Sequence, residues 1–293
     1  MNEVTTKTLR LLMPQWQGGN LPAYHFGAEL LAWLAPPAGG PVAEVKIDKP
    51  TTDTLPVEGG IVAKSALLAQ LHSAQDVIEQ HAPDKLVVLG GDCLVDLAPF
   101  AYLNKRYEGD LAVLWVDAHP DVMTPEHFKH AHAMVLGNLM GEGDPEFVAA
   151  VEQPIPPSHV MYAGMDDMSS VESAILGRLG LKTATPAELA KSSKPIIDWL
   201  KSTGVRHVAI HLDLDVLDPK QFRSLLFSNP ASPADQWANV PQGKMSIADV
   251  VRLLSDVAKE VQVVGLGITE HLPWDAIALR DMLRSLPLLG DAS

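Results

Sequence analysis

The sequence predicts an α/β fold in which helices cover both faces of a mainly parallel sheet, a three-layer α-β-α arrangement. Short runs rich in β-branched and apolar residues alternate with longer runs of helical period along almost the whole chain, which is typical of parallel strands joined by crossover helices. Most of the strand-like runs are apolar on both faces, as in a sheet that is buried on both sides. With 293 residues and 47% hydrophobic content the chain can bury a large core, and we expect a single domain over residues 1–293.

The predicted strands are spaced so that a helix or a loop fits between one and the next. They are expected at residues 9–15, 42–47, 85–91, 111–118, 159–165, 205–215 and 261–268. The run LAVLWVDA at 111–118 is a clear example, because a short apolar run bounded by turn residues suits a buried strand.

The predicted helices lie between these strands. They are expected over residues 61–82, 187–204 and 246–260, while the Pro-rich stretches 35–56 and 229–242 are expected to be loops. Ser246 is placed to cap the N-terminus of the last helix. Pro195 is expected to break the helix at 187–204, because proline removes a backbone donor and clashes with the preceding turn.

The charge and composition exclude some classes of partner. The chain has 36 acidic and 22 basic residues and a net charge of -14, and it has no basic run, so neither nucleic acid nor an anionic membrane is an expected partner. No segment approaches the roughly 20 apolar residues of a spanning helix, and the apolar patch near the start is too short for a signal peptide. A single cysteine excludes an intrachain disulfide and suits a reducing compartment, so we expect a cytoplasmic protein.

Acidic and imidazole side chains follow the predicted strands at their C-terminal ends. GGDC (90–93), DAHPD (117–121), DLDVLDP (213–219) and TEH (269–271) each come directly after an apolar run. The C-terminal ends of parallel strands meet at one edge of the sheet, where ligands bind in open α/β folds, so we expect these pieces to lie together. Alternate residues of an extended chain also share one face, which directs Asp117, His119 and Asp121 to one point.

Each piece alone has a simpler explanation, but together they predict a metal site. A lone DxD is often a turn or a helix cap, GG is often a tight turn, and a lone histidine is usually a satisfied polar residue. Together, these carboxylates would repel and desolvate one another unless cations were bound. Carboxylates with a single imidazole suit Mn²⁺ better than a closed Zn²⁺ site, and this many acids favour a pair of ions with bridging carboxylates.

The pieces GGDC, DAHPD, HLDLDVLDP and TEH, in this order and at these separations, resemble the arginase and agmatinase (ureohydrolase) family. Its hallmarks are GGDH, DAHxD and a later DxDxxDP, and the resemblance spans roughly residues 85–285. It implies an arginase-like fold and a binuclear Mn²⁺ centre with two ions per chain. It also implies hydrolysis of a guanidinium or related amidine, and assembly as a homo-oligomer, either a trimer or a hexamer.

The resemblance also implies which residues hold the metal ions. Asp117 and Asp213 match the bridging carboxylates. Asp121 would complete one metal site, and His119 with Asp215 would complete the other.

Further residues match the family's catalytic positions. Glu270 matches the acid that receives the positively charged guanidinium, and His132 stands where the family has a second histidine thought to carry protons. In the reaction implied, water activated at the metal pair attacks the guanidinium carbon, Asp121 accepts or orients the proton, and the amine leaves.

The chain departs from the family pattern at Cys93, which stands where GGDH has a metal-binding histidine. The thiol is open to three interpretations: a buried inert group, a metal ligand or a covalent nucleophile. As a ligand it would be softer than imidazole and shift preference from Mn²⁺ toward Zn²⁺, Fe²⁺ or Co²⁺. We therefore expect weak or partial occupancy of the site formed by Cys93, Asp117, Asp121 and Asp213, and better occupancy of the site with His119 and Asp215.

The chain departs from arginases again in the loop between Asp121 and His132. Met123 stands where arginases have an asparagine that helps to bind the amino-acid end of the substrate, and the loop is shorter than theirs. Arginine is therefore not the first expectation. The segment TPEHFKHAH carries His127, Lys129 and His130, which either contact a carboxylate of a different substrate or are simply solvated.

The leading hypothesis is a metal-dependent hydrolase of a small guanidino compound. Guanidino acids, agmatine, formiminoglutamate and N-hydroxylated arginine all remain candidate substrates. The alternative is a metal-depleted family member that serves as a binding or regulatory subunit. The chain lacks GxxxxGK[ST], GxGxxG and GxSxG, which argues against a nucleotide-binding protein or a serine hydrolase.

Overall fold

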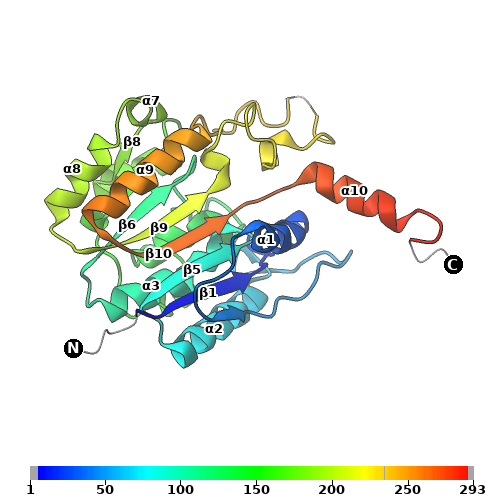
Figure 1. Ribbon diagram of the computed structural model, residues 1–293, viewed down its shortest axis with the longest axis horizontal. Helices are drawn as coiled ribbons and strands as arrows, with labels where there is room; N and C mark the ends of the chain where they lie inside the picture. Colours follow the sequence, from blue (N-terminus) through cyan, green and yellow to red (C-terminus); the bar gives the residue numbers. More distant parts are fainter. Residues whose placement is uncertain (1–5, 234, 290–293) are drawn as a thin grey trace.

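A parallel sheet of eight strands forms the centre of the computed structural model, which describes residues 6–233 and 235–289 (Figure 1). The strand order is β2-β1-β5-β10-β9-β6-β7-β8, and every pairing in this sheet is parallel. The strands are β1 (Thr8–Met13), β2 (Val42–Glu44), β5 (Lys85–Gly90), β6 (Leu111–Val116), β7 (Val160–Ala163), β8 (Lys182–Ala184), β9 (His207–Asp213) and β10 (Gln262–Thr269). The predicted α/β fold is confirmed.

Helices cover both faces of the sheet, so the molecule has three layers. Figure 1 shows α2 and α3 on one side of the strands and α8 and α9 on the other. The helices are α1 (Ala23–Leu34), α2 (Lys64–His81), α3 (Leu97–Arg106), α4 (Val135–Leu139), α5 (Pro145–Val148), α6 (Ser170–Leu179), α7 (Pro186–Leu189), α8 (Lys194–Thr203), α9 (Ile247–Glu260) and α10 (Trp274–Arg284).

The core divides into two clusters because strand side chains alternate between the two faces. On β6, Val113 and Trp115 face the cluster formed with α2 and α3, whereas Leu114 and Val116 face the cluster formed with α8 and α9. Every residue of β6 is buried. The period of two and the burial on both faces are what its uninterrupted apolar run predicts.

Two of the predicted helices differ in detail from those observed. The helix expected from residue 61 begins at Lys64, because Ile61 and Val62 form β4 and pair with β3 (Val57–Glu58) across two glycines that both have positive φ. The helix expected at 187–204 is replaced by α7 and α8. Pro195 lies in the first turn of α8, which starts at Lys194. The backbone N–H groups of a first turn have no partner within the helix, so proline is tolerated there and does not interrupt a helix.

Other elements confirm or extend the prediction. Helix α9 begins after Ser246, whose hydroxyl accepts a hydrogen bond from the backbone N–H of Asp249, as predicted. The sequence did not predict helices α1, α3, α4, α5, α6 and α10 or the short strands β3, β4 and β8. Helix α10 projects away from the body of the molecule (Figure 1), and within the part of the chain described no helix combines the length and the apolar character needed to cross a bilayer.

Candidate metal centre

The acidic pieces of the sequence come together at one edge of the sheet. They follow β5, β10, β9 and β6, which are neighbours in the centre of the sheet. We call Asp117, Asp121, Asp213 and Asp215 the acidic cluster; each of these side chains is buried. The structure thus brings together every residue that the sequence predicted for the metal and catalytic sites: Cys93, Asp117, His119, Asp121, His132, Asp213, Asp215 and Glu270.

Asp92 of the GGDC piece holds the short 3₁₀ helix η1 (Cys93–Asp96) in place. Its carboxylate accepts hydrogen bonds from the backbone N–H groups of Leu94 at 3.1 Å and Gly19 at 3.3 Å. Burial raises the pKa of Asp92 to about 6. Asp92 therefore serves as the cap that places Cys93 and Asp96 above the end of β5.

Asp117 and Asp213 are fixed by local hydrogen bonds just where their strands end. Asp117 accepts from the indole N–H of Trp115 at 2.9 Å and from the backbone N–H of His119 at 2.7 Å. Asp213 accepts from the backbone N–H of Asp215 at 2.6 Å, and the Cys93 Sγ lies 3.1 Å from its other oxygen. Burial and the nearby Asp215 charge raise the pKa of both carboxyls.

His119 is oriented by contacts at both ring nitrogens. Nδ1 lies 3.1 Å from Asp215 Oδ2 and 3.6 Å from Asp117 Oδ1, while Nε2 lies 3.1 Å from the carbonyl oxygen of Pro241. An Nε2–H that donates to this carbonyl leaves the Nδ1 lone pair facing the carboxylates, which is the tautomer a metal ligand requires. Burial lowers the pKa of His119, but the neighbouring Asp215 charge raises it by more. The net result is a pKa well above the usual range for histidine.

Asp121 and Glu270 are the site residues with unusual backbone conformations. Asp121 has φ 50° and Glu270 has φ 63°, in the left-handed region that costs energy for a residue with a side chain. Both acids are buried. Burial and the nearby Asp117 charge raise the pKa of Asp121 well above its usual range. Strain and carboxylate burial at the same residues are typical of a functional site.

Glu270 is held by side chains from distant parts of the chain. The Tyr24 hydroxyl donates to its Oε2 at 2.5 Å, and His132 Nδ1 lies 3.0 Å from its Oε1. The Cys93 thiol lies 3.6 Å from Oε1. His132 belongs to the 3₁₀ helix η2 (Ala131–Met134); burial lowers its pKa, but the hydrogen bond to Glu270 raises it more. These contacts fix the direction in which the Glu270 carboxylate faces.

The donor set fits divalent metal ions. Asp121 Oδ2, Asp215 Oδ1 and His211 Nε2 are buried and have no hydrogen-bond partner, although buried polar atoms normally have one. Ligand atoms of Asp117, His119 and Asp215 lie within 4.8 Å of one another, as do those of Asp213, Asp215 and Glu270. Carboxylate oxygens with imidazole nitrogens are suitable ligands for Mn²⁺ and related ions.

Sequence reasoning missed His211, Asp96 and Tyr24. His211 comes two residues before Asp213, and this spacing on a strand predicts that both side chains lie on one face, although it does not predict what His211 contacts. Asp96 contacts His211 across 2.7 Å. Tyr24 reaches Glu270 from α1, and nothing in the sequence around it indicates this contact.

The loop after Asp121 contains His127, Lys129 and His130, for which the sequence allows either substrate contact or solvation. Met123 is partly buried and packs against the core. His127 Nδ1 lies 3.0 Å from the Thr124 hydroxyl, and His130 Nδ1 lies 3.0 Å from the Gly19 carbonyl oxygen. Lys129 is exposed. His127 and His130 thus each have one ring nitrogen next to a local partner. Contact between this loop and a substrate stays a prediction.

Known proteins resemble this chain in sequence and in fold. The model of the arginase family matches residues 43–225. The arginase of Staphylococcus aureus (strain MRSA252) is 33% identical over 140 residues, which are 45% of this chain and 46% of that arginase; the chain thus matches about half the length of this relative.

Solved structures match over almost the whole chain. The arginase of Entamoeba histolytica, solved in complex with L-ornithine, superposes with a TM-score of 0.75 at 21% identity and covers 91% of both chains. The formimidoylglutamase of Bacillus subtilis superposes with a TM-score of 0.63 at 16% identity and covers 92% of this chain and 79% of that one. The fold, the order of the motif pieces and the extent of the family match together lead to one conclusion: the chain belongs to the arginase family.

Proposed function

We propose that this chain hydrolyses a small guanidino or other linear amidine compound, releasing an amine and urea or a urea-like product. The observation that carries the proposal is the convergence of the acidic cluster, His119 and Glu270 at one buried edge, with Asp121 and Asp215 each holding a carboxylate oxygen without a partner. We further propose that residues 1–293 act as one domain, which is supported by a central sheet that contains both β1 and β10, the first and last strands in the described part of the chain.

In this proposal the acidic cluster holds two divalent ions, with Mn²⁺ as the expected metal. Asp117, whose carboxylate lies near donors of both sets, and Asp213, which lies 3.1 Å from Cys93 Sγ and near Asp215, would be shared between the ions. Asp121 and Cys93 would complete one set, and His119 with Asp215 the other. Two such ions lower the pKa of a water molecule and so supply a nucleophile at neutral pH. The unpartnered oxygens of Asp121 and Asp215 support this use, because a cation would satisfy them.

The remaining steps belong to side chains of this protein. Glu270 would bind the planar cation through paired hydrogen bonds, which an ammonium group cannot reproduce. Tyr24, donating to Glu270 Oε2, and His132, near Oε1, fix the orientation of that carboxylate. Asp121 would accept or orient the proton lost by the attacking water. His132 would carry a proton to the departing amine.

The substrate is proposed to differ from arginine at the end that the metal centre does not contact. The asparagine expected of an arginase is replaced by Met123, which packs against the core and offers no hydrogen bond to a carboxylate or an ammonium group. The similarity in fold to both an arginase and a formimidoylglutamase supports amidines as the class without selecting one of them.

The test is a screen for urea or substituted-urea release from guanidino compounds after the protein is loaded with Mn²⁺, Fe²⁺ or Co²⁺. The screen should include agmatine, arginine, guanidino acids, formiminoglutamate and N-hydroxylated arginine. Glu270→Gln keeps the size of the side chain and removes the charge, so it should abolish turnover of a cationic substrate. Activity confined to substrates without an amidine group would contradict the proposal.

Elemental analysis separates the enzyme from the alternative, a metal-depleted binding or regulatory subunit. Metal in the purified protein, lost on changing Asp213→Ala, is the expected result. Full metal content in Asp213→Ala would contradict the bridging assignment. Absence of divalent metal from the wild-type protein even after loading would favour the alternative.

A homo-oligomer, a trimer or a hexamer, is also proposed. Helix α10 projects from the body of the molecule (Figure 1). Its apolar side chains Leu279, Met282 and Leu283 are exposed, and exposed apolar patches mark interaction surfaces. Light scattering of the purified protein would give its mass, and a monomer at micromolar concentration would contradict this part of the proposal.

A further inference from the structure

His211 is buried inside the candidate metal centre and is held rigidly there. It lies on β9, two residues before Asp213, and its side chain is fully buried. The imidazole stacks on the indole of Trp115 with ring centroids 3.7 Å apart and an angle of 13° between the planes. Trp115 is the residue opposite His211 on the neighbouring strand. The imidazole therefore has little freedom to turn.

Asp96 fixes which nitrogen of His211 carries a proton. Its Oδ2 lies 2.7 Å from His211 Nδ1, and both side chains are fully buried. A carboxylate accepts hydrogen bonds, so Nδ1 must be the donor in this pair. In the neutral imidazole this leaves the lone pair on Nε2, the arrangement found where a carboxylate supports a histidine that binds a metal.

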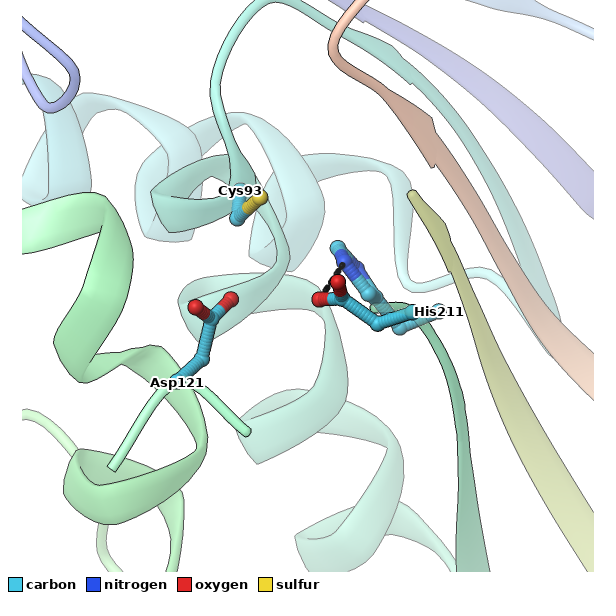
Figure 2. Close-up of side chains that lie close together, drawn as sticks. Cys93, Asp121 and His211 are labelled. Atoms are coloured by element: carbon cyan, nitrogen blue, oxygen red, sulfur yellow. Dashed lines mark ion pairs between the residues drawn. The ribbon is translucent and has the colours of Figure 1, made fainter. Parts of the chain in front are cut away.

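The His211 Nε2 faces the thiol of Cys93 and the carboxylates of Asp117 and Asp121. It has no hydrogen-bond partner, and the nearest carboxylate oxygen, Asp117 Oδ2, lies 3.8 Å away. This separation is too long for a hydrogen bond. Ligand atoms of Cys93, Asp117, Asp121 and His211 all lie within 4.8 Å of one another. Figure 2 shows the Cys93 thiol, the Asp121 carboxylate and the His211 ring directed toward the same space.

A purely structural histidine is the alternative, and His207 shows what one looks like. His207 begins β9 on the same face, stacks on Tyr107 at 3.9 Å, and has Nδ1 2.9 Å from the carbonyl oxygen of Asp110. It lies at the opposite end of the strand from the acidic cluster. His211 differs because its second nitrogen is buried, unpartnered and surrounded by acids, a costly arrangement unless a ligand is bound.

We propose that His211 Nε2 is a ligand of the metal ion that is also held by Cys93, Asp117 and Asp121, with Asp96 as the residue that positions it. This inference rests on the metal centre of the proposed function. The imidazole missing from the GGDC piece is then supplied by β9, two strands away from β5. The expectation of weak occupancy at this site no longer follows. The sulfur and nitrogen donors favour Co²⁺, Fe²⁺ or Zn²⁺ there, and Mn²⁺ at the site with His119 and Asp215.

The test measures metal binding rather than turnover. His211→Gln, Asp96→Asn and the control His207→Gln are each loaded with Co²⁺ or Mn²⁺ and titrated with a competing chelator. His211→Gln should lose one ion per chain or bind it more than about tenfold more weakly, and Asp96→Asn should weaken it by about 10- to 100-fold, as outer-shell carboxylates do. His207→Gln should match the wild-type protein. The Co²⁺ absorption spectrum should show a thiolate charge-transfer band that Cys93→Ser removes, and its ligand-field bands should shift in His211→Gln.

The outcomes separate this inference from the proposed function. Two ions on the wild-type protein, with unchanged affinity and an unchanged Co²⁺ spectrum in His211→Gln, would overturn the assignment of His211 alone. No divalent ion on the wild-type protein would overturn the metal centre and this inference together. If His211→Gln fails to fold, as judged by circular dichroism, Asp96→Asn keeps both the ring and the side-chain volume, and unchanged metal affinity in that variant would overturn the role of Asp96.

Discussion

Gly267 is the residue whose substitution gives the most direct test of how the metal centre is supported. It lies on β10 opposite His211, and the absence of a side chain leaves room for the Asp96 carboxylate. A Cβ at this position would lie 1.9 Å from Asp96 Oδ2 and 2.2 Å from Oδ1. That is about 1.6 Å closer than the separation at which non-bonded heavy atoms attract. In Gly267→Ala, Asp96 must therefore move away from His211.

The expected cost follows from what Asp96 would lose. Its hydrogen bond to His211 involves a charged group, a class of bond that contributes about 1.5 to 3 kcal/mol, and crowding a packed interior costs about 1 to 3 kcal/mol. A combined loss of about 3 kcal/mol would lower the Tm of a domain of this size by about 5 °C. The metal ion bound by His211 should be held about 10- to 100-fold more weakly, because its supporting carboxylate has moved.

The assay compares Gly267→Ala with Gly265→Ala on the same strand. A Cβ at Gly265 would lie 2.7 Å from Leu103 Cδ1 and 3.0 Å from Ala209 Cβ, so it crowds apolar atoms and leaves Asp96 alone. Both variants should melt at a lower temperature than the wild-type protein, but only Gly267→Ala should lose metal affinity in the chelator titration. Equal metal affinity in the two variants would refute the reasoning that Asp96 supports the site through His211.

Three further predictions concern other parts of the site. Tyr24→Phe removes the hydroxyl that donates to Glu270, and kcat/KM for the guanidino substrate should fall by about 10- to 100-fold, the equivalent of a hydrogen bond to a charged group; unchanged steady-state kinetics would exclude this contribution. Cys93→His should bind Mn²⁺ more tightly in a chelator titration, because imidazole is a harder ligand than thiolate, and unchanged binding would show that the thiol is not on the metal. Burial raises the pKa of Asp121 and Asp213 well above the unfolded value, so ionising them opposes folding, and this cost grows as pH rises from the unfolded pKa toward the folded one. The Tm of the metal-free protein should therefore fall between about pH 5 and pH 8, and saturating metal should reduce that fall; a constant or rising Tm of the metal-free protein would contradict the shifts.

The location of the acidic cluster could be predicted because it depends only on strand ends. Asp117 and Asp213 directly follow apolar runs, and parallel strands end at the same edge of the sheet, so neither the strand order nor any side-chain angle was needed. The Cys93 position could be predicted for the same reason. The pairing of Ile61 with Glu58, which delays the start of α2, had a local signal in the two glycines between them, a common hairpin turn.

The roles of His211 and Tyr24 could not be predicted because they depend on the order of the strands and on the path of α1. A histidine inside an apolar strand is ambiguous until its neighbours are known, and His211 is informative only because β6 brings Trp115 beside it and η1 brings Asp96 above it. Tyr24 and Glu270 are 246 positions apart in the sequence. Contacts over such separations are set by tertiary packing and not by local pattern.

The need for a glycine at position 267 allows the contact between Asp96 and His211 to be recognised in other sequences. Three residues depend on one another: Asp96, His211 and Gly267. The hydrogen bond between Asp96 and His211 needs both partners, and Gly267 leaves room for the Asp96 carboxylate. In the sequence, Asp96 comes three residues after the cysteine, His211 two residues before the first acid of DxD, and Gly267 three residues before the glutamate. They form a joint signature, GGDCxxD with HxDxD and GxTE. A relative that has the cysteine but lacks one of the other three residues would have neither the histidine of GGDH nor a supported replacement for it. Such chains can therefore be separated by sequence from those with a complete metal site.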